Sequence, residues 1–285
     1  MRHVIGRARL ERDDGPLLVA VGVFDGLHRG HAYLLDHLVR EARARAARPT
    51  VITFDAHPDA VLLGHAPPLL MDPAERIERL DAAGVEVVVI EHFDDALRQT
   101  PYDVFVRGIV ARCRLAGIVM TPDAAFGHQR EGTPAALDEL GRLDGFELIL
   151  VPPFELDGRE VRSSDIRAAI AAGDLAAAAR LLGRPYAIVG DVDAAGRMTL
   201  PMPVALPPAG RYRVMAVQRS GADGGDVADG ARSADEDDGA RSADGARAAD
   251  LEIANGNVTL SDGPGSGPTR VSFDNAWSRV ERHHT

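Results

Sequence analysis

The chain has 285 residues, of which 45% are hydrophobic, and this length allows one large domain with a sizeable core and a second, smaller one. The formal net charge of −11 disfavours a general nucleic-acid binder, and no stretch reaches the roughly 18 uncharged apolar residues of a membrane helix, so we expect no nucleic-acid or membrane partner and a cytoplasmic protein. One cysteine, Cys113, excludes an internal disulfide framework, and the complete lack of lysine excludes the P-loop signature.

Short apolar runs alternate with segments of helical periodicity between residues 17 and 185. The runs that we interpret as strands are "LLVAVGV", "TVITF", "VEVVVI", "AGIVM" and "FELILV". Strands that alternate with helices favour a parallel sheet. We therefore expect residues 1–185 to form an α/β domain with a Rossmann-like, doubly wound parallel sheet.

Helix boundaries are also marked. Leu34, Leu35, Leu38, Val39 and Ala42 share one apolar helix face, and Thr133 precedes Pro134 as an N-cap precedes the first helical residue. In the segment 161–186, Ser163 or Ser164 is a candidate cap of one short helix and Asp174 of the next, with Gly183 ending it.

The composition becomes β-rich after Pro185, which predicts a smaller domain over residues 186–285 that resembles a β-barrel. "LEIANGNVTL" has Asn-Gly at the position of a two-residue hairpin turn. An acidic, low-complexity tract over 219–250, in which "DGARSAD" occurs twice, interrupts this domain. We expect that tract to be a disordered insertion.

The junction after the first apolar run, "VAVGVFDGLHRGH", combines three glycines with two histidines. Gly22, Gly26 and Gly30 allow a close approach of the backbone to a ligand, although their spacing is not that of dinucleotide-binding loops. His28 and His31 lie three residues apart at a helix start, where phosphate groups bind. The junction predicts a phosphate-binding site.

Three interpretations of the two histidines stay open. They could bind zinc, with His57 as a third ligand, or they could be structural residues of a helix start. They could also donate hydrogen bonds to phosphate oxygens and stabilise the charge that builds up during phosphoryl transfer. We favour the third interpretation because the pair lies within a glycine-rich junction.

"GVFDGLHRGH" resembles the HxGH motif of nucleotidyltransferases, in the form found in bacterial bifunctional FAD synthetases, which join a riboflavin kinase to an FMN adenylyltransferase. The resemblance continues through "VITFDAHP", "FGHQREGTPAALDEL" and "VRSSDIRAAIAAGDLAAAARLLGRPY", in the order and at the spacing of that family. It covers residues 17–190 and implies transfer of AMP from ATP to FMN, with Mg²⁺, to give FAD and pyrophosphate.

The resemblance implies roles for residues of the junction. His28 and His31 would contact the ATP triphosphate, and a further set would shape the ATP site: Gly22, Phe24, Asp25, Gly26 and Gly30. The role of Asp25 stays open between holding magnesium, orienting a histidine and capping the turn. No other metal ligand is assigned.

More roles follow from the later motifs. Ser163, Ser164 and Arg167 would hold the leaving pyrophosphate, although Arg162 stands where the family has its first serine. His57, Asp123 and Phe126 would contact the flavin or another acceptor, with His57 equally suited to the ATP side or to a turn before Pro58. The family's flavin motif is altered, because Thr121 replaces a glycine and Ala124 an aromatic residue.

The second domain departs further from the family. It lacks the Gly-x-Pro-Thr-Ala-Asn segment of riboflavin kinases, and "WSRVERHHT" shows no long amphipathic helix. We expect a degenerate kinase domain without kinase activity. Two alternatives to FAD synthesis are an adenylyltransferase for a different phosphorylated acceptor and a non-catalytic protein that binds nucleotide or flavin.

Overall fold

The structure is a computed structural model that describes residues 1–219 and 245–273. Its contacts divide the chain into two compact units. The first comprises Met1–Pro68 and Pro73–Ser163, and the second comprises Leu69–Asp72 and the described residues from Ser164 onward. The sequence analysis instead put the boundary after residue 185, so the two divisions differ in where they assign the helices between Ser163 and Leu182.

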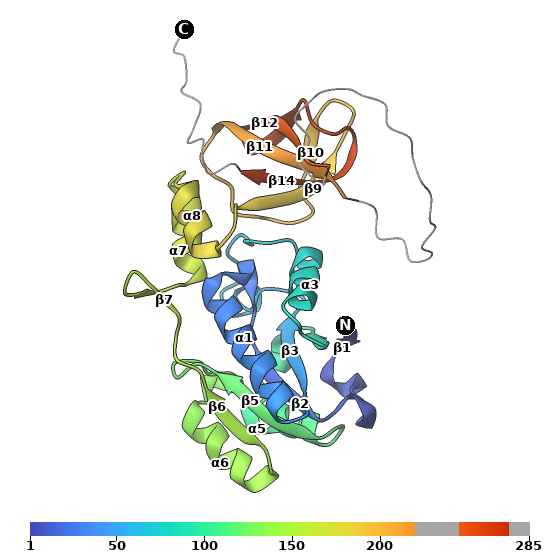
Figure 1. Cartoon of the computed structure of the whole chain (residues 1–285), viewed down its shortest axis with the longest axis vertical. Helices are drawn as coiled ribbons and strands as arrows, with labels where there is room; N and C mark the ends of the chain where they lie inside the picture. Colours follow the sequence, from blue (N-terminus) through green and yellow to red (C-terminus); the bar gives the residue numbers. More distant parts are fainter. Residues whose placement is uncertain (220–244, 274–285) are drawn as a thin grey trace. The chain divides into compact units, whose positions relative to one another are not determined.

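The first unit contains a six-stranded parallel sheet in the order β1-β4-β3-β2-β5-β6 (Figure 1). Its strands are β1 (Arg2–Ile5), β2 (Leu17–Val21), β3 (Arg48–Phe54), β4 (Val87–Glu91), β5 (Leu115–Met120) and β6 (Glu147–Leu150). The chain runs outward from β2 to β4 and then returns to the other side of β2 with β5. This reversal makes the sheet doubly wound, and ligands bind such sheets beyond the carboxyl ends of the strands at the reversal.

The five predicted strands of this unit are confirmed, and β1 was missed. Arg2–Ile5 pairs in parallel with β4 at the edge of the sheet, and only Val4 of its four residues is buried. The strand is short, and its two apolar residues are too few to form a recognisable apolar run. Its position depends on the pairing partner that β4 offers.

Helices cover both faces of the sheet. They are α1 (Arg29–Ala44), α2 (Asp59–Leu62), α3 (Pro73–Ala82), α4 (Asp95–Arg98), α5 (Tyr102–Val110) and α6 (Pro134–Asp144), with 3-10 turns η1 (Arg7–Arg9), η2 (Arg12–Asp14), η3 (Asp25–Leu27) and η4 (His128–Arg130). Helix α1 packs on β2 and β3 through the apolar face that the sequence predicted, with Leu35, Leu38, Val39 and Ala42 buried (Figure 1). Thr133 caps α6 as predicted, since its hydroxyl accepts a hydrogen bond from the N–H of Ala136.

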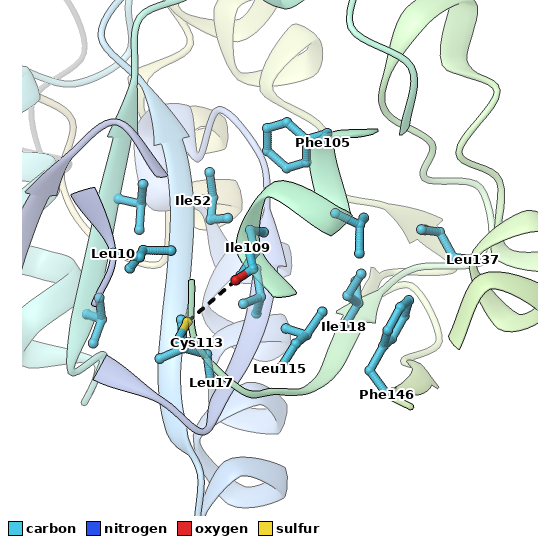
Figure 2. Close-up of a cluster of buried hydrophobic side chains, with 14 of the residues drawn as sticks. Leu10, Leu17, Ile52, Phe105, Ile109, Cys113, Leu115, Ile118, Leu137 and Phe146 are labelled. Atoms are coloured by element: carbon cyan, nitrogen blue, oxygen red, sulfur yellow. Dashed lines mark hydrogen bonds between the residues drawn. The ribbon is translucent and has the colours of Figure 1, made fainter. Parts of the chain in front are cut away.

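Apolar side chains from α5 and α6 form a core against the sheet (Figure 2). Phe105 and Ile109 of α5 belong to one cluster of buried residues with Leu17, Ile52 and Ile118 of the strands. Cys113 belongs to this cluster, and burial followed by the nearby Asp14 carboxylate raises the pKa of its thiol. Cys113 therefore packs as a small buried hydrophobic residue.

Two short strands, β7 (Glu155–Leu156) and β8 (Arg159–Glu160), lead to helices α7 (Ser163–Ala171) and α8 (Leu175–Leu182). The predicted cap of α8 is confirmed, because Asp174 accepts a hydrogen bond from the N–H of Ala177 and Gly183 ends the helix in the left-handed conformation. Helix α7 begins at Ser163 itself. The Ser163 hydroxyl therefore lies in the first turn, where it donates to the Asp25 carbonyl instead of capping.

The second unit contains a closed antiparallel barrel in the order β10-β13-β12-β11-β14-β9. Its strands are β9 (Ala187–Val192), β10 (Arg197–Thr199), β11 (Gly210–Gln218), β12 (Arg247–Ala254), β13 (Asn257–Ser261) and β14 (Gly267–Phe273). Buried side chains fill the barrel, with Phe273 against the rings of Tyr186 and Tyr212. Asn255 and Gly256 both have positive φ, as the predicted two-residue hairpin turn requires.

The prediction that the insertion extends over residues 219–250 is wrong at its C-terminal end. Strand β12 begins at Arg247 and pairs with β11, so residues 247–250 belong to the barrel. Alternation explains this, because Ala249 is buried while its neighbours Ala248 and Asp250 are exposed. Residues 220–244 and the final segment "WSRVERHHT" lie outside the described residues. Within the described parts, no helix is both long and apolar enough to cross a membrane.

Candidate active site

The site begins in the loop between β2 and α1. Phe24 has a φ of 53°, in the left-handed region that an aromatic residue rarely adopts, and Gly26 follows with a φ of 77°. A Cβ at Gly22 would lie 3.1 Å from the Phe24 ring, so the glycine lets the ring lie against the backbone. Phe24, Asp25 and Gly26 are all buried. The loop is therefore compact and tightly constrained.

His28 and His31 lie side by side at the start of α1. Their rings stack with centroids 3.7 Å apart and an interplanar angle of 19°. His28 is the N-cap of the helix, and its Nδ1 accepts a hydrogen bond from the backbone N–H of His31 over 3.3 Å. That bond places the proton of a neutral His28 on Nε2.

The imidazole of His31 is half-buried, and its Nδ1 atom is buried. Burial, and then the charge of neighbouring His28, lower the pKa of His31 well below its ordinary value. Its ring also contacts Phe24 at a centroid distance of 5.2 Å. No group among the described residues forms a hydrogen bond with its buried Nδ1. His31 is therefore neutral at pH 7 and oriented by two aromatic neighbours.

The segment before α7 contacts the same junction. A Cβ at Gly30 would lie 3.1 Å from two ring atoms of His28 and 3.4 Å from the Val161 carbonyl oxygen. The Ser163 hydroxyl donates to the Asp25 carbonyl over 3.2 Å. The structure thus brings Ser163 together with the histidine loop, as the sequence analysis expected. Ser164 and Arg167 belong to the second unit, with Ser164 exposed and Arg167 half-buried on α7.

A cavity of about 640 Å³ opens beyond the carboxyl ends of the strands of the first unit. Val21, Gly22 and Val23 form one wall of the cavity, so it adjoins the histidine loop. Four aromatic residues are among those that line it: Phe54, Phe93, Phe105 and Phe126. Its volume and its aromatic lining are typical of sites for flat organic ligands.

Two of the three predicted acceptor contacts line this cavity. His57 and Phe126 are among its lining residues, and the Nδ1 of His57 accepts a hydrogen bond from the N–H of Asp59. Asp123 is not among the lining residues. It is exposed in the turn after β5, where its carboxylate accepts a hydrogen bond from Thr121, the residue that replaces the family's glycine.

Sequence reasoning missed residues whose side chains hydrogen-bond to the backbone of the site. Arg76 of α3 is buried and donates to the carbonyls of Val23 and Phe54, at 2.9 and 2.8 Å. Thr53 is also buried and donates to the Val23 carbonyl over 3.1 Å. Because these bonds end on backbone atoms, no spacing of residue types indicates them.

Residues outside the cavity hold two of the aromatic side chains in its wall. The Arg7 guanidinium lies over the Phe105 ring, 4.4 Å from its centroid, and pairs with Glu91 over 2.8 Å. Phe105 in turn meets Phe126 edge-on at a centroid distance of 5.6 Å. An N-terminal segment that carries no motif therefore orders two of the four cavity rings.

The arrangement suits an anionic ligand beside an aromatic one. Imidazole N–H groups and the N-terminus of α1 favour phosphate oxygens, and the adjoining cavity favours a planar ring system. Within residues 1–219 and 245–273, no group of three or more His, Cys, Asp or Glu side chains is arranged to hold a metal ion. His57 is thus not part of such a group with His28 and His31 among these residues.

Comparisons with known proteins identify the family of the chain. The profile of the FAD synthetase family matches residues 10–165, more than half of the chain. The bifunctional riboflavin kinase/FMN adenylyltransferase of Haemophilus influenzae is 34% identical over 176 residues, which cover 61% of this chain and 57% of that protein. The protein with the same description from Escherichia coli is 32% identical over 199 residues, which cover 68% of this chain and 63% of that protein.

The matches span about three fifths of the length of these relatives. A solved structure described as a macrolide-efflux protein from Streptococcus pneumoniae is 21% identical and superposes with a TM-score of 0.75, covering 100% of this chain and 93% of that one. This likeness shows a shared fold. From the match over residues 10–165, which include the histidine loop and all but the first strand of the parallel sheet, we conclude that the chain belongs to the FAD synthetase family.

Proposed function

We propose that the protein is an ATP-dependent FMN adenylyltransferase. A phosphate oxygen of FMN attacks the α-phosphorus of ATP, and the bond from that phosphorus to the oxygen bridging to the β-phosphate breaks. The products are FAD and pyrophosphate. The attacking oxygen is already anionic, so the reaction needs positioning and charge stabilisation rather than a base or a covalent intermediate.

The observation that carries this proposal is the stacked histidine pair at the N-terminus of α1, directly beside the aromatic cavity. The loop that holds His28 and His31 also supplies a wall of the cavity through Gly22 and Val23. A nucleotide triphosphate on the histidines would thus have its α-phosphorus near an acceptor in the cavity. Adenylyl transfer requires that proximity.

The histidines act as hydrogen-bond donors to the triphosphate. Because the Nδ1 of His28 accepts a bond from the chain, His28 would donate through its Nε2–H, and the Phe24 ring contacts His31 beside it. Preorganised donors stabilise the charge that grows on the phosphate oxygens at little reorganisation cost. Gly22, Gly26 and Gly30 keep the backbone close to the nucleotide.

Magnesium enters with ATP in this proposal. Mg²⁺ in nucleotide sites is commonly held by one or two carboxylates together with substrate phosphates. Asp25 is a buried carboxylate in the histidine loop and fits the role of a magnesium ligand. It fits equally well the alternative role of fixing the turn. Ser163, Ser164 and Arg167, near the start of α7, would hold the departing pyrophosphate.

The cavity binds the acceptor. Phe126, together with Phe54 and Phe93, supplies aromatic surface for an isoalloxazine ring, and His57 lies on the same wall as Pro58. Asp123 would contact the acceptor from the turn after β5. The partners are then the small molecules ATP and FMN, with no nucleic acid and no membrane.

We further propose that riboflavin kinase activity is lost. The connection between β10 and β11 has the sequence "LPMPVALPPA" in place of the kinase segment. Barrel residues bond to this connection, because the hydroxyls of Tyr186 and Tyr212 donate to the carbonyls of Ala205 and Pro208. Hydroxyls that bond to the chain's own carbonyls support a structural rather than a catalytic role for the barrel.

The test is pyrophosphate release by the purified protein with MgATP and either FMN or riboflavin, with products identified by mass and absorbance. FAD from FMN alone supports both proposals, and FMN from riboflavin would refute the loss of kinase activity. Release of pyrophosphate only with another phosphorylated acceptor favours a different adenylyltransferase. Binding of ATP without any pyrophosphate release indicates a non-catalytic protein.

A further inference from the structure

We propose that Thr53 and Arg76 are positioning residues of the active site, which hold the Val23 carbonyl and thereby fix Phe24 and the stacked histidines. Neither residue belongs to the histidine loop itself. The kinetic part of this inference rests on the proposed function. The geometric part does not, and it is tested separately below.

The Val23 carbonyl receives two hydrogen bonds from buried side chains. The Thr53 hydroxyl reaches it from the end of β3 over 3.1 Å, and one Arg76 nitrogen reaches it from α3 over 2.9 Å. A carbonyl oxygen has two lone pairs, so both of its acceptor sites are used. The peptide between Val23 and Phe24 is therefore held in one orientation.

That peptide sets the conformation of Phe24. A left-handed aromatic residue is strained and persists only where its surroundings determine it, and such strain is concentrated at functional sites. Phe24 has a φ of 53°, and its ring contacts His31. If the Val23 carbonyl rotated, Phe24 would relax toward an ordinary conformation, and His31 would lose the ring that holds it against His28.

Arg76 links the loop to the cavity as well. Its second terminal nitrogen donates to the Phe54 carbonyl over 2.8 Å, and Phe54 lines the cavity. A guanidinium presents several donors in a rigid plane, so one side chain can fix two carbonyls at a set spacing. Lysine offers no such planar fork. Arg76 thus sets the spacing between the histidine loop and one aromatic wall of the cavity.

The first experiment compares Thr53→Val with Thr53→Ser, because valine keeps the shape of threonine and removes its hydroxyl, whereas serine keeps the hydroxyl. NMR with labelled histidine and phenylalanine measures the nuclear Overhauser effects between the Phe24 and His31 rings without substrate. We expect them to weaken in Thr53→Val and to persist in Thr53→Ser. We expect kcat for FAD formation to fall about 10- to 100-fold in Thr53→Val, as sub-ångström misplacement does, and to recover in Thr53→Ser.

Arg76→Lys and Arg79→Gln form the second pair. Arg79 lies on the same helix and pairs with Glu75, one third exposed and without a bond to the histidine loop. We expect Arg76→Lys to shift the His31 ring signals and lower kcat, and Arg79→Gln to do neither. Circular dichroism confirms that each variant is folded.

The outcomes separate the two ideas. Unchanged ring contacts and unchanged kcat in folded Thr53→Val would overturn the positioning role. Altered ring contacts in a protein that makes no FAD even as the wild type would sustain the positioning role and refute the proposed function. Altered kcat in Thr53→Ser, equal to that in Thr53→Val, would show that the hydroxyl is not the cause and would also overturn the inference.

Discussion

Gly30 lies between the two histidines in the sequence. Adding one methyl group there is expected to lower activity without lowering stability. A Cβ there would lie 3.1 Å from the His28 ring and would push it out of the stack with His31. Alanine is also the better helix former by about 1 kcal/mol. We therefore expect Gly30→Ala to lower the rate of FAD formation at least tenfold while the melting temperature stays level or rises.

Gly145 provides the matched control for that prediction. It ends α6 in the left-handed conformation with a φ of 80°, and a Cβ added there would have no neighbour within 4 Å. Gly145→Ala should lose about 1 kcal/mol of stability and keep full activity. Calorimetry and a rate assay on both variants check this crossed pattern, and a parallel loss of activity in the two would contradict it.

Removal of the His31 imidazole should affect chemistry and leave the fold intact. His31→Ala deletes a donor to the transition state, which typically costs about 100-fold or more in rate. His37→Ala, farther along α1, deletes a ring that packs edge-on against Tyr33 and should leave the rate unchanged. Single-turnover FAD formation measures both variants. A near-normal rate in His31→Ala would mean that the histidines are structural.

The lowered pKa of His31 makes the free energy of unfolding depend on pH, and the direction of the shift gives the sign of that dependence. Below the ordinary value of 6.5 the unfolded chain binds a proton at this residue, while the folded protein does not. The free energy of unfolding therefore falls as the pH drops below about 6.5, with a slope of at most about 1.4 kcal/mol per pH unit. Urea unfolding of the wild type and of His31→Gln checks this, and equal slopes would contradict it.

Among the elements, the N-terminal segment contributes more to the stability of the fold than its sequence indicates. The Arg7 backbone N–H and guanidinium both donate to the Glu91 carboxylate, at 2.6 and 2.8 Å, and Glu91 is buried. Breaking a buried pair by removing one partner costs about 3–5 kcal/mol, because the other charge stays buried. Arg7→Met should be destabilised by that order, and Arg7→Met with Glu91→Gln should recover most of it. Equal stability of the single and double variants in urea would contradict this.

The sequence predicted elements where local chemistry decides the structure. Thr133 before Pro134, Asp174 and the Asn255-Gly256 turn carry their own hydrogen-bonding or φ preferences, and each was found as expected. It missed β1, whose pairing depends on β4. It also extended the insertion into β12, because a polar outer face hid the alternation there.

The same division holds at the site. The glycine spacing and the paired histidines predicted a phosphate-binding loop, and this stays a prediction that rests on residues close together in the sequence. Thr53 and Arg76 gave no signal, because each acts on a carbonyl supplied by another element. Such contacts exist only after the sheet has formed.

For the whole molecule, the acidic tract should be dispensable. Strands β11 and β12 pair up to Ala216 and Arg247, so the barrel keeps its pairing partners when residues 221–244 are replaced by a short Gly-Ser linker. We expect unchanged FAD formation and melting temperature. Extending the deletion through Asp250 removes the buried Ala249 and should lower the melting temperature. A large loss of activity in the shorter deletion would reveal a role for the tract.

Strands β11 and β12 pair although a long segment of the chain separates them. The connection between them is therefore a site where another domain could be inserted. A hairpin that does not depend on a tight turn accepts a folded guest whose own ends lie close together, since surface connections of this kind tolerate domain insertion. A fluorescent reporter spliced between Arg219 and Gly245 would travel with the barrel and leave both the parallel sheet and its histidine loop untouched. Such a chimera would let the protein be located by microscopy in living cells.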